Sequence, residues 1–507
     1  MPELTASCDE RHGATSPVAN SPGWLKKVQA LLYPSALIAS ISIWFVALRA
    51  PLRLDEALSY WQVSGGFLKV WTRSALMPSS IGYLYCLWAA KSILGSSELA
   101  LKVPSLVALL LAVYFLFRMV RELFERETAY LTCVFFAIES NVIFAATDVR
   151  PYAFALLATT LAGFGFVRWM ARGQVRQAAL FGAAASMVLY FHYLYACVLP
   201  AFAIYYLIAR WRFIKRDTRQ LAIILATFGL GSIPLVYRVI SLYETRQTHI
   251  LQEMLHPGLV VLNTLVPRQT LIGFLTVSFI AALARRITLP ERGEWPKVLM
   301  GPLLALVPAV ILITVSTITP AHLLIPRYLT AAAPGSALLW ALLTRRVDSG
   351  WLRQSFCAFL VLVTVVESYR FPARRKHELS LKAAHEVVNE MEKREQVPVL
   401  VCSGFVESDY ESMPKDRNEE NPLLSQVEFY PIHGPIEMIP ISLNERTVRL
   451  ASQATARIAQ THGRFLMIVA PESYPVLQWL SGYLNGQFAW RILSNSDGVI
   501  VVEFTTL

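Results

Sequence analysis

The sequence predicts a polytopic α-helical membrane protein followed by a small soluble α/β domain. Of the 507 residues, 55% are hydrophobic and only 16% are charged, and the mean hydropathy is +0.46. Soluble globular proteins usually carry about 25% charged residues, so lipid is the expected solvent for most of this chain. Long apolar runs fill the first 370 residues, whereas the remainder alternates short polar and apolar segments.

Charge follows the same division. The chain has 46 Lys and Arg residues against 35 Asp and Glu residues, a net charge of +11. From Phe371 onward there are 13 basic and 17 acidic residues, so the tail carries −4 and the first 370 residues carry +15. Because the basic excess lies in short loops between apolar runs, no nucleic-acid partner is expected. The six cysteines are scattered without a CxxC pair, which predicts no disulfide framework.

The N-terminal segment, residues 1–29, is polar and rich in Ser, Pro, Gly and Asn, so we expect it to be disordered and cytoplasmic. The first apolar run, 31–50, follows Lys26 and Lys27. It is long enough to cross a hydrocarbon core of about 30 Å. It is also too long and too far from the N-terminus for a cleaved signal peptide, so we interpret it as a signal anchor.

Ten further apolar runs of spanning length follow, which predicts about 11 transmembrane helices within a membrane domain of residues 30–371. The eleven runs are 31–50, 103–119, 128–147, 151–169, 177–192, 194–209, 220–240, 269–284, 298–319, 327–343 and 353–370.

The run Ser80–Leu94 is short and holds Lys91, and loop charge decides its place. Lys and Arg in short loops mark the cytoplasmic side of a membrane protein. Without a span at this run, twenty Lys and Arg residues fall on the cytoplasmic side and eleven on the other. A span there would exchange the sides of every later loop. We therefore place Ser80–Leu94 in the outer interface, where Tyr83, Tyr85 and Trp88 suit the headgroup zone.

Eleven spans from a cytoplasmic N-terminus place the tail, residues 372–507, on the outer, extracytoplasmic side. Its apolar periodicity predicts helices near 381–391, 445–460 and 475–485 and strands at 397–402, 465–470 and 498–504. A loop rich in Glu, Asp, Asn and Pro follows the first strand. The tail is therefore expected to be a small α/β domain, and it contains no glycine-rich nucleotide-binding motif.

Polar residues at the outer ends of spans are the candidates for chemistry. Asp55 and Glu56 come directly after the first span. Two adjacent carboxylates are costly to hold near lipid unless they are paired or used, although a helix cap would also explain them. Asp148 and Arg150 follow the third span, where a plain helix start at Pro151 is the alternative.

Arg327 and Tyr328 open the tenth span, where an Arg that reaches the interface would be unremarkable by itself. All three groups nevertheless fall on one membrane face once the loop charges fix the topology. A shared outer cavity would hold carboxylates beside Arg150, Arg327 and Lys69. Carboxylates can take a proton from a hydroxyl, and cations can hold a phosphate. Together they indicate a reaction at the lipid surface with a phosphate leaving group.

These residues form an ordered set with the segment Leu94–Ser105, which opens the second span. The set comprises Asp55-Glu56, LGSSELALKVPS, the motif Asp148-Val-Arg150-Pro-Tyr152-Ala, and Arg327-Tyr328-Leu. It resembles the GT-C membrane glycosyltransferases of the protein O-mannosyltransferase and lipid A aminoarabinose transferase type, over about Leu31 to Leu343. The resemblance implies a GT-C-like fold, a polyprenyl-phosphate-sugar lipid donor, a catalytic first outer loop at 51–102, and inversion at the anomeric carbon.

Two positions depart from the family pattern. Members commonly have a His-Pro-Pro-like stretch in the first outer loop, and here the residues are Met77-Pro78-Ser79-Ser80. Lys102 stands where Arg is common, which keeps the charge but loses the bidentate fork.

The resemblance also implies roles. Asp55 would be the general base that deprotonates the acceptor hydroxyl, Glu56 would orient the site, and Asp148 would be a second acid near the sugar or acceptor. Cationic side chains would stabilise the polyprenyl phosphate as it leaves. The expected substrate-binding residues are Arg150, Tyr152, Lys69, Tyr60, Arg327, Tyr328 and His192.

Other interpretations stay open from the sequence. Histidines at 192, 249 and 256 lie on the outer side without short ligand spacing, so a divalent metal is possible but not favoured, and no cofactor is predicted. A polyprenyl-linked sugar flippase or another multispan transporter is the alternative function. Transporters usually place ionisable residues at mid-membrane, whereas here they cluster at outer ends. The sugar, the hydroxyl acceptor (lipid, glycan or protein) and the role of the tail are undetermined.

Overall fold

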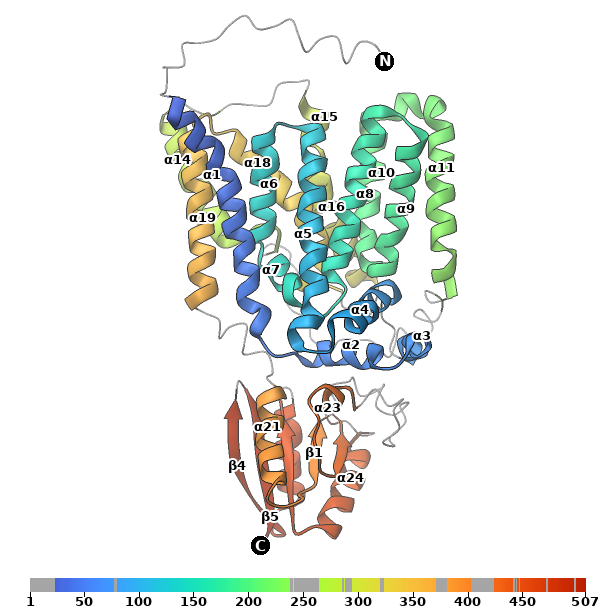
Figure 1. Cartoon of the computed structure of the whole chain (residues 1–507), viewed down its shortest axis with the longest axis vertical. Coiled ribbons are helices and arrows are strands. Elements are labelled where there is room, and N and C mark those ends of the chain that lie inside the picture. The colour runs from blue at the N-terminus through green and yellow to red at the C-terminus, as the bar shows by residue number, and fades with distance from the viewer. Residues whose placement is uncertain are drawn as a thin grey trace, which may run out of the picture.

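The computed structural model of the chain has a helical bundle and a sheet domain stacked along its long axis (Figure 1). It describes residues 23–76, 80–237, 240, 264–284, 287, 294–319, 323–370, 381–402, 424–440, 443, 445, 447–470, 473–496 and 498–507. Several predictions lie outside these residues: the disorder of 1–22, the Met77-Pro78-Ser79 stretch, and His249 and His256.

The bundle consists of helices that run roughly along the long axis (Figure 1). In chain order its main elements are α1 (Gly23–Ser42), η1 (Ile43–Arg49), α5 (Glu98–Leu123), α6 (Arg126–Ile138), α7 (Ser140–Thr147), α8 (Tyr152–Arg172), α9 (Val175–Phe191), η2 (Tyr193–Val198), α10 (Leu199–Arg210), η3 (Trp211–Phe213), α11 (Ile214–Ser232), η4 (Ile233–Leu235), α14 (Arg268–Leu283), α15 (Trp295–Val298), α16 (Met300–Ile318), α17 (Pro326–Leu329), η7 (Thr330–Ala332), α18 (Ala333–Arg345) and α19 (Gly350–Arg370).

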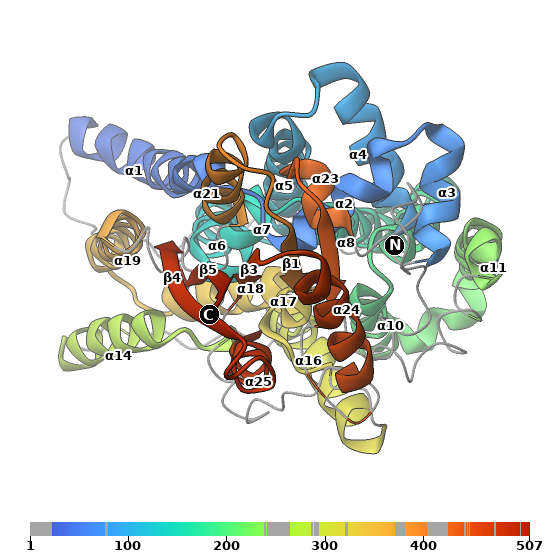
Figure 2. The same ribbon diagram turned by 90° about the horizontal axis from the view of Figure 1, so that it is seen from below.

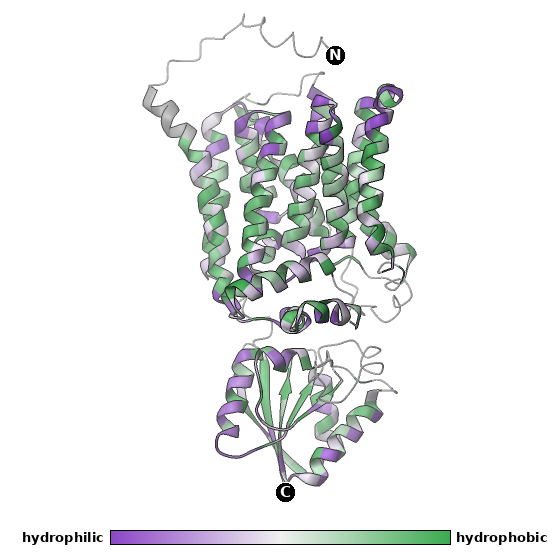
Figure 3. Ribbon diagram, turned by 45° about the vertical axis from the view of Figure 1, so that its right-hand side comes forward, coloured by the Kyte–Doolittle hydropathy of each residue, from purple (hydrophilic) through white to green (hydrophobic). Residues whose placement is uncertain are grey.

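The predicted spans coincide with these helices or with consecutive pairs of them. In the described residues, five helical stretches are long and apolar enough to cross a membrane, or six if the bent pair α6–α7 is one span. Four further apolar helices are shorter. Hydrophobic residues cover the middle of the bundle and hydrophilic residues gather at its two ends (Figure 3). The chain is thus a multi-pass membrane protein, and the count of eleven spans stays a prediction.

Three helices lie across the end of the bundle that faces the sheet domain (Figure 1). They are α2 (Leu54–Ser64), α3 (Phe67–Leu76) and α4 (Ile81–Leu94). All three belong to the predicted first outer loop, 51–102. The placement of α4 agrees with the prediction that Ser80–Leu94 lies in the interface.

Side-chain caps fix the starts of two helices, α5 and α7, and so position polar residues near this end of the bundle. The α5 helix begins where the Ser97 side chain accepts a hydrogen bond from Ala100 N at 3.2 Å. Between α6 and α7 the chain bends by 69° at Glu139. The Glu139 carboxylate accepts a hydrogen bond from Val142 N at 2.8 Å and so caps α7 inside the bundle. The bend directs α7 toward the segment that carries Asp148.

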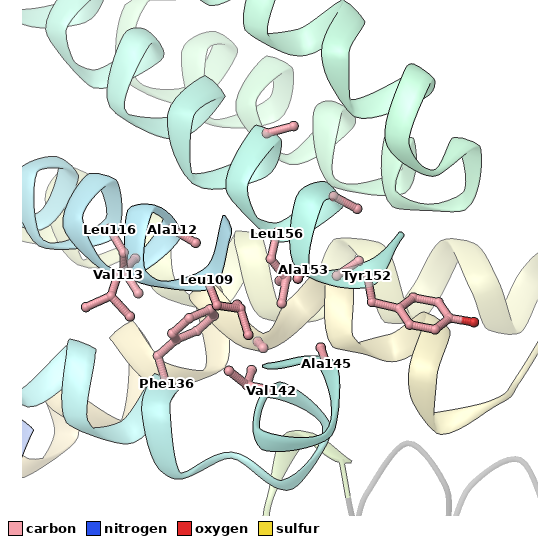
Figure 4. Packing of buried hydrophobic residues seen from close by; sticks show 14 of the residues in the cluster. Leu109, Ala112, Val113, Leu116, Phe136, Val142, Ala145, Tyr152, Ala153 and Leu156 are labelled. Carbon is pink, nitrogen blue, oxygen red and sulfur yellow. The ribbon is translucent and has the colours of Figure 1, made fainter. Parts of the chain in front are cut away.

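The bundle core lies between α5, α6, α7 and α8 (Figure 4). Large side chains such as Leu109 and Phe136 are fully buried there beside small ones such as Ala112 and Ala153. Small residues let helix backbones approach closely, which supplies the packing that holds membrane helices together. Gly335 shows the same principle, because a Cβ there would lie only 2.3 Å from a backbone atom of α16.

The C-terminal domain has a five-stranded mixed sheet with strand order β2-β1-β3-β5-β4. Strand β1 pairs in parallel with β2 and β3, and β5 pairs antiparallel with β3 and β4. Its elements are α21 (Leu381–Glu392), β1 (Val399–Cys402), α23 (Ser425–Phe429), β2 (Ile436–Ile439), α24 (Thr447–Thr461), β3 (Arg464–Val469), α25 (Tyr474–Tyr483), β4 (Phe488–Ser496) and β5 (Val499–Thr506). All six predicted helices and strands of the tail are present, whereas α23, β2 and β4 were not predicted.

Candidate active site

Glu56 ties the start of α2 to the segment between α7 and α8. Its side chain is buried, and one carboxylate oxygen accepts a hydrogen bond from Arg53 N at 2.8 Å. The other oxygen accepts one from Val149 N, also at 2.8 Å. Because both oxygens hold backbone amides, Glu56 fixes the position of its neighbour Asp55 relative to residues 148–150.

Asp148 lies beside Glu56 and is paired with Arg53. The Asp148 carboxylate is buried, and its Oδ1 accepts a hydrogen bond from Arg53 Nη2 at 2.8 Å. Ser105 on α5 donates a hydrogen bond to the Asp148 main-chain oxygen at 2.7 Å. Burial raises the pKa of Asp148, and the Arg53 guanidinium acts against that rise. The Arg53 guanidinium also lies 4.1 Å from the centre of the Phe144 ring.

Asp55 is the carboxylate that faces solvent and the cations. Its side chain is 45% exposed, and its Oδ2 lies 3.0 Å from Arg327 Nη1. Arg150 Nη1 donates a hydrogen bond to the Asp55 main-chain oxygen at 3.2 Å. Partial burial by itself would raise the pKa of Asp55, but the guanidinium groups of Arg150, Arg327 and Arg53 hold it below its usual value. Asp55 is therefore ionised at neutral pH.

Aromatic rings surround His192 on the other side of the two arginines. The centroids of the Tyr195, Tyr152 and Tyr328 rings lie 5.1, 5.4 and 5.5 Å from that of His192. His192 itself is buried, and it also lies 5.6 Å from the ring centre of Tyr193.

A cavity of about 100 Å³ lies between these groups. Residues from α2, α4, the start of α8, the end of α9 and α17 line it, among them Ser59, Gln62, Tyr83, Arg150, Tyr152, His192 and Tyr328.

Three polar atoms of the lining residues are buried without a hydrogen-bond partner among the described residues: Tyr83 Oη, Arg150 Nε and His192 Nδ1. Asp148 Oδ2 and Arg327 Nε, on site residues outside the lining, are also buried without such a partner. A buried polar group without a partner costs about 1–3 kcal/mol. Such a concentration at one cavity indicates groups that are reserved for a ligand.

Two predicted binding residues lie elsewhere. Tyr60 turns toward the C-terminal domain, where its ring packs edge-on against Phe429 with centroids 4.8 Å apart. Lys69 is on α3, which contributes no lining residue to this cavity. The structure therefore gathers Asp55, Glu56, Asp148, Arg150, Tyr152, Arg327, Tyr328 and His192, but not these two.

Two residues of the site were missed as site residues in the sequence. Arg53 pairs with Asp148, and Tyr83 lines the cavity, although interface anchoring was the favoured interpretation of Tyr83 over a place in a lipid or sugar groove. The sequence feature that could have indicated Arg53 is the position of a cation two residues before an acidic pair. Lys102, where the family commonly has Arg, donates hydrogen bonds to the main-chain oxygens of Leu48 and Ala50 and so holds the end of η1.

No group of three or more His, Cys, Asp or Glu side chains that could hold a metal ion occurs among the described residues. The gathered site consists of carboxylates beside guanidinium groups.

A family model described as dolichyl-phosphate-mannose-protein mannosyltransferase matches residues 78–236. This segment runs from before α4 to the end of α11 and includes Asp148, Arg150 and His192. A comparison with curated proteins finds no significant match.

Solved membrane-enzyme structures share the fold over nearly the whole chain. ArnT from Cupriavidus metallidurans in the apo state is 10% identical with a TM-score of 0.53, and the alignment covers 95% of this chain and 98% of that one. The same protein bound to undecaprenyl phosphate is 12% identical, with the same TM-score and coverage. The oligosaccharyltransferase from Archaeoglobus fulgidus, in complex with Zn and sulfate, is 12% identical with a TM-score of 0.50, over 92% of this chain and 72% of that one.

These likenesses and the family match confirm the resemblance predicted from the sequence. Over nearly its whole length the chain has the fold of ArnT.

Proposed function

We propose that this protein is an inverting glycosyltransferase that moves a sugar from a polyprenyl-phosphate-sugar donor to an acceptor hydroxyl at the outer membrane face. One observation carries the proposal: the ionised, half-exposed Asp55 carboxylate pairs with Arg327, while Arg150 holds the main-chain oxygen of the same residue. A base next to two cations is what attack by a hydroxyl and departure of a phosphate together require. The binding of undecaprenyl phosphate by ArnT, a protein of the same fold, supports a polyprenyl phosphate carrier.

In the proposed reaction Asp55 removes the proton from the acceptor hydroxyl. The oxygen forms a bond to the anomeric carbon while the bond between that carbon and the phosphate oxygen breaks. The electron pair leaves with the polyprenyl phosphate. Attack from the face opposite the leaving group inverts the anomeric centre.

The cations and the second acid have separate proposed roles. Arg150 and Arg327 stabilise the charge on the departing phosphate, and each has a buried Nε without a partner among the described residues. Asp148, whose buried Oδ2 has no partner among the described residues, is the proposed second acid near the sugar or acceptor, while Glu56 holds Asp55 in place through its two backbone contacts. Tyr152, Tyr328 and His192 form the apolar and hydrogen-bonding wall against which a sugar ring can lie.

The test is transfer from a panel of radiolabelled polyprenyl-phosphate sugars in membranes that contain the wild-type protein or Asp55→Asn. We expect label to reach an acceptor only with the wild type, because loss of a general base costs about 10²–10⁴ in rate. Equal transfer by both proteins would show that Asp55 is not the base. Donor binding without any transfer, unchanged by the substitution, would favour a flippase or scaffold.

A further inference from the structure

The C-terminal domain contacts the helix that carries Asp55. In the interface, α23 lies beside α2 (Figure 2). There the ring of Phe429 packs against that of Tyr60. On the same helix, Leu58 and Trp61 belong to a buried cluster that also contains Val388 and Ile432 of the domain. The domain core and α2 thus share one hydrophobic contact surface.

One phenol of the domain connects the two ends of the first outer loop. Tyr430, which follows α23, is buried, and its hydroxyl accepts a hydrogen bond from Leu52 N at 2.8 Å. The same hydroxyl donates a hydrogen bond to Glu98 Oε1 at 2.9 Å. Leu52 lies three residues before Asp55, and Glu98 is the first residue of α5. Through one accepted and one donated hydrogen bond, the hydroxyl therefore connects the start of the loop to its end.

Tyr430 is itself held by the rest of the domain. His385 on α21 is buried, and its Nδ1 lies 2.5 Å from the Tyr430 main-chain oxygen. Lys382, one turn earlier on α21, forms an ion pair with Glu98 at 3.1 Å. Asn389 donates a hydrogen bond to the Pro431 main-chain oxygen at 2.8 Å. These contacts fix the phenol as part of a rigid element instead of a free side chain.

Leu52 is a sensitive point for the site. The next residue, Arg53, contributes its amide to Glu56, its guanidinium to Asp148 and its main-chain oxygen to the first turn of α2. A shift of Leu52 would therefore change the position of Asp55 relative to Arg150 and Arg327. Misplacement of a reacting group by about 1 Å can cost about 10² in rate.

We infer that Tyr430 is a positioning residue through which the C-terminal domain holds α2 and Asp55 in the reactive arrangement. This inference rests on the proposed function, because it assigns a role in that reaction. The domain then contributes to turnover without touching the sugar donor. Donor binding relies on Arg150 and Arg327, which Tyr430 does not contact.

The first test is Tyr430→Phe in the full-length protein, with Tyr483→Phe as the matched control. Tyr483 lies in the same domain, is 46% exposed, and stacks on Trp479. For Tyr430→Phe we expect kcat to fall by about tenfold to a hundredfold while the donor KM changes by less than about twofold. The control keeps wild-type kcat. If Tyr430 had a purely structural role, the substitution would reduce the amount of active protein, but the folded molecules would not show a lowered kcat with an unchanged KM. The amount of active protein is therefore measured by donor binding.

Glu98 supplies a conservative variant. Glu98→Gln keeps an oxygen that can accept the Tyr430 hydrogen bond, so it is expected to retain most of kcat. Glu98→Ala removes that oxygen and should resemble Tyr430→Phe. Because either single variant already removes the hydrogen bond between Tyr430 and Glu98, the double variant Tyr430→Phe with Glu98→Ala should lose no more than about twofold beyond Tyr430→Phe.

Hydrogen–deuterium exchange gives a measurement that does not depend on transfer. We expect faster exchange of the amides of 52–58 in Tyr430→Phe, because Leu52 N loses its acceptor and the first turn of α2 loosens. If the exchange rate of these amides and kcat in Tyr430→Phe both equal the wild-type values, the inference is overturned. Absence of transfer by the wild type with every donor would instead count against the proposed function, and exchange would still decide whether Tyr430 holds α2.

Discussion

At the scale of single residues, the site is defined by the different environments of two carboxylates. Asp55 is 45% exposed and its pKa is lowered by Arg150, Arg327 and Arg53, whereas Asp148 is buried and its pKa is raised. A pair of acids whose pKa values are moved in opposite directions is a common basis for separate roles in catalysis. This contrast depends on burial and on the nearest cation.

The pH dependence of the rate tests the environment of Asp55. A free Asp has a pKa of about 3.9, so the lowered pKa keeps Asp55 ionised, and kcat/KM should stay flat as pH falls to about that value. Replacing Arg327 by Gln removes a cation that favours the ionised form, so the pKa of Asp55 rises and the acid limb of the kcat/KM profile moves to higher pH. The charged neighbours that remain are Arg53, Arg150 and Asp148.

The control for this measurement is Arg457→Gln, since Arg457 pairs with Glu437 on the exposed surface of the C-terminal domain. Its acid limb should match that of the wild type. An acid limb that stays in place in Arg327→Gln would show that Asp55 is not the group whose ionisation controls the rate.

The buried pair of Arg53 and Asp148 gives a prediction about stability. Arg53→Gln leaves the Asp148 carboxylate, which is 1% exposed, without its cation. An uncompensated buried group costs about 1–3 kcal/mol or more, so the midpoint of thermal unfolding in detergent should fall. Adding Asp148→Asn removes the charge and should restore part of the loss. A double variant that unfolds at a lower temperature than Arg53→Gln would contradict this explanation.

The sequence could suggest most site residues because their types are unusual where they stand. Acids and arginines at the ends of apolar runs are costly near lipid, so their presence indicates use. Arg53 was missed because a cation beside a membrane span is ordinary. Tyr60 was expected to bind substrate, yet its ring packs against Phe429 of the C-terminal domain. Spacing along the chain does not show which face of a short helix meets another domain.

At the scale of elements, a second charged cluster fastens the helices at the end of the bundle away from the site. Glu127 on α6 accepts a hydrogen bond from Tyr33 of α1 at 2.7 Å. It also accepts bonds from Arg345 of α18 at 2.5 Å and from Arg353 of α19 at 2.8 Å. One carboxylate therefore joins four helices that are far apart in sequence.

We expect Glu127→Ala to lower the midpoint of thermal unfolding while leaving donor KM unchanged. The reason is that partly buried guanidinium groups lose their shared acceptor. Glu390→Ala is the control, because Glu390 pairs only with the exposed Lys393 one turn away on α21, in a contact worth little. Equal unfolding midpoints in the two variants would show that the cluster does not fasten the bundle.

The C-terminal domain shows which strands can be predicted from the pattern of apolar residues and which cannot. Strands β1, β3 and β5 are nearly continuous apolar runs, because both of their faces are covered, and such runs are visible in a sequence. Strand β2 has only four residues, and the edge strand β4 mixes Arg491, Ser494 and Asn495 with exposed apolar side chains. Such edge strands depend on pairing with a neighbour, which a single segment does not reveal.

At the scale of the whole molecule, the arrangement of the two ends of the bundle constrains the topology. The α1 helix begins at the end away from the sheet domain, and α19 ends next to that domain (Figure 1). Between these two points the chain therefore crosses the bundle an odd number of times. The predicted number of spans, eleven, is also odd. The connection from α10 through η3 to α11 lies at the end where α1 begins (Figure 1), and it includes Arg210, Arg212 and Lys215.

This arrangement, together with the excess of basic residues in the loops of that end, predicts which end faces the cytoplasm. In intact cells a membrane-impermeant maleimide should label Tyr483→Cys in the C-terminal domain but label Arg212→Cys only after permeabilisation. Both positions are exposed in the structure, and the native cysteines within the described residues are buried or half-buried. Both variants are made in a Cys8→Ser background, because Cys8 lies outside the described residues. The reverse pattern would place Asp55 and its cavity on the cytoplasmic side, where the donor would have to be a lipid of the inner leaflet.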